Sequence, residues 1–452
     1  MQLYDFYREH PCVTTDSRDC PPGSIFIALK GESFDGNRFA AAALDKGCAL
    51  AVVDDPAARE AYLANGGDPT RMMLVCDALQ TFKDLAREHR RQFNIPVIGI
   101  TGTNGKTTTK ELVRAVLAAK FNVLATEGNF NNDVGVPKTL LRLRPEHEIA
   151  IVEMGASHPG DIKTLAATAE PTCGLITNVG KAHLLGFGSL EGVLHTKGEL
   201  YDNLASRPGS AIFVNADNDL LASILPQDVA VERYTAHGAP GCTVEGELVA
   251  CDPMLRLRWR HADGAWREVT THLIGSYNID NVLAAVTVGL HFGVELERIS
   301  AAIEAYEPSN NRSQLVVTGH NRLVVDAYNA NPTSMAAALD NFALIPAERK
   351  MAIIGEMREL GDVSREEHER LVARLSEMDL DTVWLVGHEF DGIDDAAGAR
   401  ARGIVNGQPF KMRRFADVEQ VKAAIAAEHP EGYTILVKGS NGNRLFTLPT
   451  LL

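Results

Sequence analysis

Lys106 and Thr107 are the residues whose types and spacing point most directly to chemistry. They follow Gly105 in ITGTNGKTTTK, residues 100–110, between an apolar run and a stretch of helical periodicity. A lysine there can reach the terminal phosphates of a nucleotide, a threonine hydroxyl can ligate Mg²⁺, and the N–H groups that open a helix attract anions. Gly-Lys-Thr in this position favours a nucleoside triphosphate site over a turn without a ligand, although Ile100 replaces the first glycine of G-x-x-x-x-G-K-[ST]. The candidate contacts are Gly102, Thr103, Asn104, Gly105, Lys106, Thr107 and Thr108.

Two further side chains are predicted to reach the same place. Glu153 ends the apolar run 149–152, so its carboxylate should emerge at the carboxyl edge of a parallel sheet and serve as a second magnesium ligand. The alternative is a solvated cap or an ion-pair partner. His183 lies in the segment 177–183, which repeats this geometry on another strand and also delivers Asn178. A histidine alone is more often structural, but Glu153 and Lys106 nearby favour a metal or phosphate role.

Other polar segments are ambiguous by themselves. Lys197 lies in the helical run 190–200 beside Glu199, and its spacing alone indicates a solvated lysine on an exposed face. The amide-rich loop with Asn129, Asn131, Asn132 and Gly135 leaves a strand end and serves either as a turn or as a site for a polar substrate. The segments 326–332 and 438–440 also follow strands, and each is consistent with an ordinary loop.

Three α/β units must position these residues. Residues 13–91 alternate short apolar runs with helical stretches, and a longer strand–helix series begins at Pro96, which predicts a parallel, doubly wound sheet. Between residues 242 and 273 the pattern changes to short alternating runs with Trp259 and Trp266, which indicates added antiparallel strands. After a polar hinge at 307–311, a second α/β series follows. We therefore predict domains at 1–92, 93–309 and 310–452.

Composition narrows the class of protein. The chain has 452 residues, a net charge of −15 and seven cysteines without C-x-x-C pairing. The charge argues against a nucleic-acid-binding surface or attachment to anionic lipid, and an odd cysteine count favours reduced thiols over a disulfide framework. We find no run of about 18 uncharged apolar residues and no signal-like start, so we expect a soluble, cytoplasmic protein without membrane insertion.

Taken in order, the motifs resemble the Mur ligases, the cytoplasmic ATP-dependent amide-forming enzymes that build the peptidoglycan stem peptide. The resemblance spans nearly the whole chain. Within the family, residues 128–132, 326–332 and 355–361 are most similar to the member that adds D-alanyl-D-alanine to UDP-N-acetylmuramoyl tripeptide, and the tetrapeptide Asp-Asn-Pro-Arg of the diaminopimelate-adding member is absent. The family's Pro-Gly-Arg and Asp-Ser-Tyr-Asn are here 310–312 (Asn-Asn-Arg) and 326–329 (Asp-Ala-Tyr-Asn). The segments that carry the resemblance are 16–18, 31–36, 102–111, 153–155, 178–183, 197–199, 275–281, 326–332 and 438–440.

The resemblance implies a mechanism. A substrate carboxylate attacks the γ-phosphate of ATP to give an acyl phosphate, and the incoming amine then displaces phosphate. It assigns Lys106 to the β- and γ-phosphates and Thr107 with Glu153 to one Mg²⁺. A second Mg²⁺ would use His183 and a carbamylated Lys197, because an unmodified ammonium would repel the metal. The implied adenosine and phosphate contacts further along the chain are Asn278, Asn281, Arg312 and Asp326.

The resemblance also implies where the other substrates bind. A small N-terminal α/β domain would bind the UDP end, a central P-loop parallel-sheet domain with added antiparallel strands would bind ATP, and a C-terminal Rossmann-like α/β domain would bind the dipeptide and close over the site. It further implies a monomer. The implied substrate contacts are Ser17, Arg18, Gly31, Asp35, Gly36, Asn129, Asn131, Asn132, Asn329 and Asn331.

Other interpretations make different predictions. Another ligase of the superfamily, such as one that adds glutamate to folate, would not need the uridine site that the segment 16–18 indicates; without the family, that segment reads more simply as a turn cap. A non-catalytic ATP-binding regulator should have lost the metal-site residues, yet all of them are present: Lys106, Thr107, Glu153, His183 and Lys197. A kinase would not explain three domains.

Overall fold

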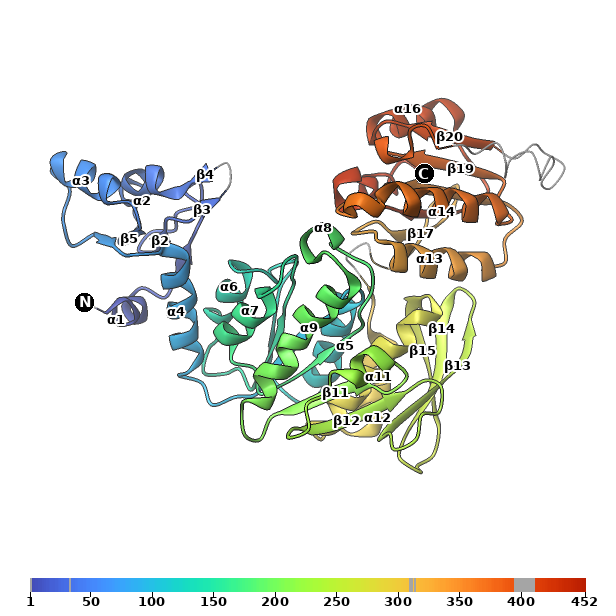
Figure 1. The fold of residues 1–452 in the computed structure, drawn as a ribbon, viewed down its shortest axis with the longest axis horizontal. Coiled ribbons are helices and arrows are strands. Elements are labelled where there is room, and N and C mark those ends of the chain that lie inside the picture. The colour runs from blue at the N-terminus through green and yellow to red at the C-terminus, as the bar shows by residue number, and fades with distance from the viewer. Residues whose placement is uncertain (1, 32–33, 309–311, 313, 394–410) are drawn as a thin grey trace.

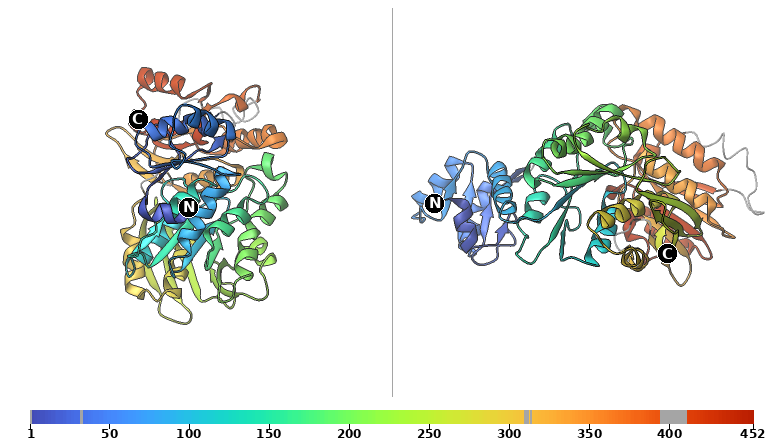
Figure 2. Two further views of the ribbon diagram at one scale, coloured as in Figure 1. Left: turned by 90° about the vertical axis from the view of Figure 1, so that its left-hand side faces the viewer. Right: turned by 90° about the horizontal axis from the view of Figure 1, so that it is seen from below.

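The chain forms three α/β domains arranged in a row. The computed structural model describes residues 2–31, 34–308, 312, 314–393 and 411–452. The N-terminal and C-terminal domains lie at opposite ends of the central domain (Figures 1 and 2). The predicted fold class is therefore confirmed. Residues 309–311, where the second domain boundary is predicted, lie outside the described residues, and both boundaries stay predictions.

The N-terminal domain is a small four-stranded sheet covered by helices. The strand order is β1-β2-β5-β6, and all three pairings are parallel. Strands β2 and β5 are wholly buried, as their apolar runs predict. The elements are α1 (Leu3–Glu9), β1 (Val13–Thr14), β2 (Ile25–Ile27), β3 (Lys30–Gly31), β4 (Phe34–Asp35), η1 (Gly36–Phe39), α2 (Ala40–Asp45), β5 (Leu50–Val53), α3 (Pro56–Ala64), β6 (Met72–Leu74) and α4 (Ala78–Arg90).

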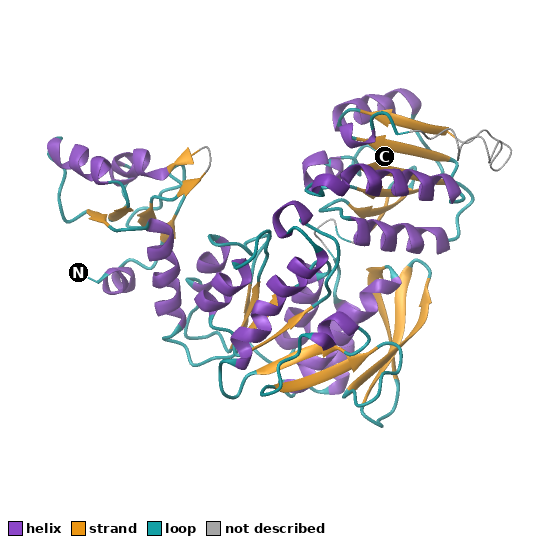
Figure 3. Cartoon of the chain, viewed as in Figure 1, coloured by secondary structure: helices purple, strands orange, loops and turns teal. Residues whose placement is uncertain are grey.

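The central domain is built on one nine-stranded sheet with helices on both faces (Figure 3). The order is β15-β14-β13-β12-β11-β10-β7-β9-β8, parallel from β8 through β13. The elements up to β11 are β7 (Val97–Thr101), α5 (Lys106–Ala118), β8 (Val123–Ala125), α6 (Gly135–Leu140), β9 (Ile149–Glu153), α7 (Asp161–Ala169), β10 (Cys173–Ile176), α8 (Leu184–Phe187), α9 (Leu190–Ala205) and β11 (Ala211–Asn215).

The predicted antiparallel strands extend this same sheet. Strands β13, β14 and β15 pair antiparallel in sequence order, and their alternating pattern buries Trp259 against the central core. Strand β12, which joins them to the parallel part, was not predicted. The remaining elements are α10 (Asp219–Ser223), β12 (Ala230–Thr235), β13 (Val244–Cys251), β14 (Met254–His261), β15 (Arg267–Ile274), η2 (Ser276–Asn278), α11 (Ile279–His291) and α12 (Leu296–Ala305).

The C-terminal domain has a six-stranded sheet in the order β16-β17-β21-β18-β19-β20, parallel except for the edge strand β16. The edge strands β16 and β20 were not predicted, because each is only partly buried and lacks a continuous apolar run. The elements are β16 (Gln314–Val317), β17 (Arg322–Asp326), α13 (Pro332–Leu344), β18 (Lys350–Gly355), η3 (Gly361–Val363), α14 (Ser364–Glu377), β19 (Thr382–Val386), η4 (His388–Phe390), β20 (Lys411–Phe415), α16 (Val418–Glu428), β21 (Thr434–Lys438), η5 (Asn441–Asn443) and η6 (Leu445–Thr447).

The central domain contacts both of its neighbours. Tyr7 and Phe82 of the N-terminal domain belong to the same buried cluster as Leu141 and Ile162 of the central domain, so α1 and α4 pack directly against it. The C-terminal domain meets the central loop 178–185 through polar contacts, described below, and Ile274 of β15 belongs to the buried cluster of the C-terminal domain. Among the described residues, no helix is both long enough and apolar enough to cross a membrane.

Candidate active site

The predicted phosphate loop joins the carboxyl end of β7 to helix α5. Gly105 caps α5 with a positive φ of 77°, and a Cβ there would lie 2.6 Å from Asn281 Oδ1. Gly102 has φ 143°, and a Cβ there would lie 2.0 Å from Thr177 Oγ1. The glycine that permits close approach therefore stands two positions after Ile100, which explains why the incomplete motif still forms the loop.

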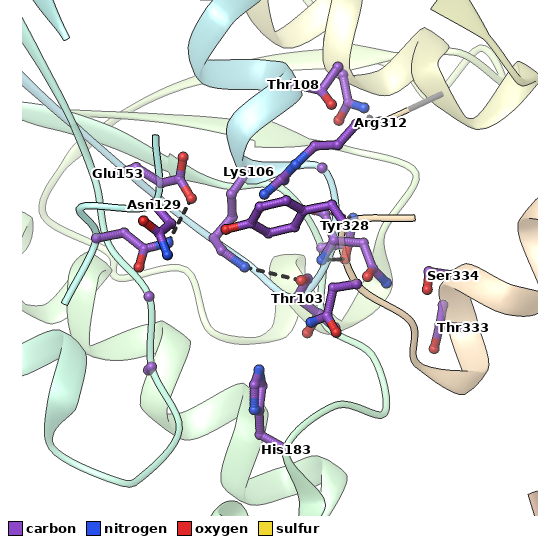
Figure 4. Close-up of a pocket in the computed structure, with 18 of the residues that line it drawn as sticks. Thr103, Lys106, Thr108, Asn129, Glu153, His183, Arg312, Tyr328, Thr333 and Ser334 are labelled. Carbon is purple, nitrogen blue, oxygen red and sulfur yellow. Dashed lines mark hydrogen bonds between the residues drawn. The ribbon is translucent and has the colours of Figure 1, made fainter. Parts of the chain in front are cut away.

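Lys106 points from the start of α5 back across this loop (Figure 4). Its ammonium donates hydrogen bonds to the carbonyl oxygens of Gly102 (2.7 Å) and Thr103 (3.1 Å). Burial lowers the pKa of Lys106 to about 8, while Glu153 opposes that shift and the Arg312 cation adds to it. A cation held over a helix N-terminus is suited to the terminal phosphates of a nucleotide.

Glu153 joins the phosphate loop to the asparagine-rich loop. Its side chain is 1% exposed, accepting from the Thr107 hydroxyl (2.9 Å) and from Asn131 Nδ2 (2.8 Å). A Cβ on Gly155 would lie 2.9 Å from Asn131 Oδ1, so this glycine admits the asparagine loop. A hydroxyl and a carboxylate oxygen in contact form a hard donor pair that fits Mg²⁺.

The loop after β10 backs the phosphate loop, as predicted. Asn178 accepts from the Thr103 and Asn104 backbone N–H groups (2.9 and 3.0 Å), through its carbonyl oxygen and its Oδ1 respectively. His183, further along the same loop, lines the cavity from the side opposite α5 (Figure 4). Burial lowers the pKa of His183, and the Glu359 carboxylate opposes the shift.

Asn278 and Asn281 form a buried chain of hydrogen bonds beside Gly105. Asn281 Nδ2 donates to Asn278 Oδ1 (2.8 Å), Asn281 Oδ1 accepts from the Thr109 hydroxyl (3.0 Å), and Asn278 Nδ2 donates to the carbonyl of Ile274 (2.8 Å). These bonds tie the start of α11 to the start of α5. Both asparagines line the cavity and also fix its wall.

The C-terminal domain supplies the opposite wall. The Arg312 guanidinium lies 3.8 Å from the centre of the Tyr328 ring, and among the described residues its buried Nε has no hydrogen-bond partner. Asp326 forms an ion pair with Lys438, which is almost wholly buried. Asn331 donates to Asn104 Oδ1 (2.7 Å) and caps α13, so its side chain already bridges the two domains.

Together these residues enclose a cavity of about 580 Å³ between the central and C-terminal domains. A second cavity of about 830 Å³ shares Asn129, Arg312 and Tyr328 with it and includes Thr107.

Five residues that were not predicted also line the first cavity: Tyr277, Asp280, Tyr328, Thr333 and Ser334. All five belong to segments that the sequence singled out, or directly follow one, so proximity to those motifs was the available signal. The predicted residues that line the first cavity are Thr103, Asn104, Gly105, Lys106, Thr108, Asn129, Asn131, Asn132, Glu153, Asn178, His183, Asn278, Asn281, Arg312, Asp326 and Asn329.

Lys197 is buried, so the interpretation of its spacing as a solvated lysine is wrong. Its side chain is 2% exposed, and its ammonium lies 5.6 Å from the centre of the Phe187 ring. Val193, Tyr201 and Lys197 share the buried face of α9 at i±4 spacing, a signal that the sequence already contained. Burial lowers the pKa of Lys197 well below its ordinary value, and the nearby Lys106 cation adds to this; Asp161 and Glu199 oppose it.

The predicted contacts in the N-terminal domain lie outside this cavity. Arg18 is exposed and forms an ion pair with Asp16 (2.7 Å), which also accepts from the Arg18 backbone N–H. Ser17 contributes a carbonyl oxygen to Lys46 (2.6 Å). Asp35 caps η1, and a Cβ on Gly36 would lie 2.6 Å from the carbonyl oxygen of Leu29. Gly31 is exposed. The turn-capping role of segment 16–18 is therefore real, and a role in binding UDP stays a prediction.

Asp280 gives the site a pH-dependent effect on stability. Burial raises the pKa of Asp280 from 3.8 to about 6, and the Asp217 carboxylate adds to the shift. Between these two pH values the folded chain holds a proton that the unfolded chain has lost, so this group's contribution to stability falls as pH rises through that range. Because the side chain is partly exposed, we expect Asp280→Asn to stabilise by only about 1 kcal/mol at pH 7.5. That corresponds to a rise in Tm of roughly 2–4 °C, which should shrink at pH 5.

Thermal unfolding at the two pH values measures this difference, with the exposed Asp219→Asn as the matched control. An equal change in Tm at pH 5 and pH 7.5 would contradict a raised pKa at Asp280.

Comparison with known proteins places the chain in a family. Three family models match, namely the Mur ligase middle domain over residues 100–289, the Mur ligase glutamate ligase domain over 311–441, and the Mur ligase family catalytic domain over 11–90. The chain is 35% identical to a UDP-N-acetylmuramoyl-tripeptide--D-alanyl-D-alanine ligase from Synechocystis sp., with 95% of this chain and 89% of that protein covered.

Solved structures give the same result. MurF from Acinetobacter baumannii matches with a TM-score of 0.83 and 30% identity, over 97% of this chain and 92% of that one. The MurF ligase from Thermotoga maritima in complex with ADP matches with a TM-score of 0.81 and 25% identity, over 97% and 96%. The phosphate loop, the glutamate on the neighbouring strand and the three-domain order thus occur in a chain that belongs to the Mur ligase family.

Proposed function

We propose that this chain is the ATP-dependent ligase that joins D-alanyl-D-alanine to UDP-N-acetylmuramoyl tripeptide in peptidoglycan precursor synthesis. The observation that carries the proposal is the cavity in which Lys106 and Glu153 of the central domain face Arg312 and Asn329 of the C-terminal domain. Relatives that match over nearly the full chain carry the name of this ligase. Amide formation from a carboxylate and an amine requires activation, and a site for ATP beside a second substrate site meets that requirement.

Charge neutralisation and positioning are the tasks of the residues around the phosphates. Lys106 and Arg312 approach the cavity from different domains, so a triphosphate between them would be held from two sides. The substrate carboxylate attacks the γ-phosphorus and expels ADP, giving an acyl phosphate; the amine of the dipeptide then attacks the acyl carbon and expels phosphate. The buried Asn278 and Asn281 pair would hold the adenosine side.

At one position, the side chains fit a divalent metal without any covalent modification. Thr107 and Glu153 would hold Mg²⁺, which supplies charge neutralisation at the phosphates. His183 and Lys197 would serve a second ion, but Lys197 fits only as a carbamate. Burial favours the neutral amine of Lys197. The neutral amine is the form that adds CO2, with loss of one proton, to give the negatively charged carbamate.

The outer domains would hold the ends of the two peptide substrates. Asn329 lines the cavity and would contact the dipeptide, whereas Asn331 would act by fixing the domain interface through Asn104. Asn129, Asn131 and Asn132 would meet the tripeptide end of the acceptor near Glu153. The segments 16–18 and 31–36 would bind the UDP end. Docking of the C-terminal domain would exclude water from the acyl phosphate.

The test is phosphate release from ATP and Mg²⁺ with UDP-N-acetylmuramoyl tripeptide, with and without D-alanyl-D-alanine, together with mass analysis of the product. We expect release that requires both substrates and a mass gain of one dipeptide less water. Turnover with a single amino acid and a shorter acceptor would assign the chain to another step of the family. If no pair of acceptor and amine gives phosphate release, a nucleotide-binding regulator would be the favoured function. Sedimentation of the active protein would test the expected monomer.

A further inference from the structure

The segment 355–361, GEMRELG, has no role in the proposed function, yet the C-terminal domain holds it firmly. Ser440 Oγ donates to the carbonyl of Glu356 (2.8 Å) and accepts from the Arg358 N–H (3.1 Å). The Met357 N–H donates to His368 Nε2 (3.0 Å). The loop is therefore fixed from β21 and from α14, and what it carries at its tip has a defined position.

At that tip, Glu359 crosses to the central domain. Its carboxylate contacts Nδ1 of His183, and its carbonyl oxygen accepts from the Leu185 N–H (3.3 Å). Glu359 and His183 both have a positive φ, 63° and 51°, which non-glycine residues rarely adopt. Two strained residues from different domains thus meet through one side-chain contact, and a second contact, from the Leu185 N–H to Glu359, helps to offset the backbone cost.

The contact determines which nitrogen of His183 is free. An ionised carboxylate can only accept, so in the neutral imidazole the proton lies on Nδ1. The other nitrogen, Nε2, is then a lone pair, and His183 lines the cavity that Lys106 also lines. Carboxylate-bound imidazoles of this kind are a common arrangement for histidines that bind a metal or accept a proton.

We propose that Glu359 is a positioning residue, which the C-terminal domain delivers so that docking of that domain fixes the tautomer and orientation of His183. The contact makes amide formation depend on docking of the C-terminal domain, through the Glu359 carboxylate. This consequence for the reaction rests on the proposed function. The tautomer itself does not depend on that function. The segment 355–361 is then the part of the C-terminal domain through which docking acts on His183 of the central site.

Other contacts let Glu359 be changed without loss of docking. Lys181 pairs with Glu367 (2.8 Å), Asn104 bonds with Asn331, and a Cβ on Gly180 would lie 2.8 Å from Thr333 Oγ1, so the domains also touch away from Glu359. The Glu359 side chain is 58% exposed, and exposed ion pairs contribute little to stability. Glu359→Ala should therefore fold and dock.

The first measurement is ¹⁵N NMR of histidine-labelled, ligand-free full-length protein, with His183→Gln to assign the signal. We expect the Nδ1–H tautomer in the wild type and loss of that preference in Glu359→Ala. Glu359→Gln should keep it, because the glutamine carbonyl still accepts from Nδ1–H. The control is Glu366→Ala, whose carboxylate pairs with Arg370 on the surface of the same domain.

The second measurement is steady-state turnover. We expect kcat to fall about 10- to 100-fold in Glu359→Ala with an unchanged Tm, to recover largely in Glu359→Gln, and to be unchanged in Glu366→Ala. A wild-type His183 signal together with wild-type kcat in Glu359→Ala would overturn the inference. If the wild-type chain joins no substrates, the proposed function fails, while the NMR result still decides whether Glu359 sets the tautomer.

Discussion

Lys106→Ala is expected to lower kcat/KM for ATP-dependent amide formation by about 10³-fold, with the fold intact. The lysine is the one cation in the part of the phosphate loop that the structure describes, and its ammonium bonds only to the carbonyls of Gly102 and Thr103. Those two bonds leave a donor free for phosphate oxygens. Burial strengthens the interaction of this charge with a phosphate. Initial rates over a range of ATP concentrations, together with thermal unfolding, measure the effect.

The control is Lys163→Ala, which removes an exposed lysine from α7. It should leave kcat/KM within about twofold, since Lys163 does not line the cavity and an exposed charge is screened by salt. A fall of less than tenfold in Lys106→Ala would contradict the proposed contact with the phosphates. A large drop in Tm would instead indicate that Lys106 mainly holds the loop together.

The sequence predicted the parts of the fold that depend on local patterns. Strand β9 was predicted to end at Glu153, because a continuous apolar run ends sharply there. Strand β16 pairs with the next strand, β17, and was not predicted because none of its residues is fully buried. Strand β12 also carries a weak apolar pattern, and its place depends on parallel pairing with β11 across helix α10. Such pairing is a tertiary effect that no short window of sequence contains.

The residues of the candidate site also fall into two groups, those that local sequence patterns predict and those that only the tertiary structure brings together. Lys106, Glu153 and Asn178 converge because parallel strands bring their carboxyl ends to one edge, a rule that applies without coordinates. The prediction of a solvated Lys197 was wrong, because it relied on the charge of the side chain and not on the helical spacing that Lys197 shares with Val193 and Tyr201. The contact between His183 and Glu359 could not be predicted, since it joins residues 176 positions apart across a domain interface.

The distance between the outer domains suits the long acceptor of the proposed function. Ser17 and Arg18 lie outside the cavity, and Figure 2 shows the N-terminal domain beyond the far side of the central sheet. A long substrate could be held by its nucleotide end there while its carboxylate reaches Lys106. The N-terminal domain packs on the central domain through the apolar Tyr7 and Phe82. The C-terminal domain meets it through polar contacts and through one buried apolar residue, Ile274, with Met254 packed nearby. This interface holds fewer apolar residues of the central domain, so we expect the C-terminal domain to move between steps.

Lys197→Ala is expected to lower kcat about 10²- to 10³-fold and to regain about tenfold on addition of acetate or propionate. Burial lowers the pKa of Lys197 and so favours the neutral amine, the form that reacts with CO2. The resulting carbamate would place a negative group beside His183 and Lys106, where the free ammonium would repel a metal ion. A short carboxylate in the space left by alanine restores that charge.

Two comparisons make the rescue specific. Sodium chloride at equal ionic strength should give no recovery, and Lys106→Ala should stay inactive with the same carboxylates, because its missing group is a cation. A ¹³C signal from labelled CO2 on the wild-type chain, absent from Lys197→Ala, would identify the modified residue directly. Full activity of Lys197→Ala, or loss of activity without any rescue, would count against the carbamate; the buried amine would then act as a neutral hydrogen-bonding group, the other state that its lowered pKa permits.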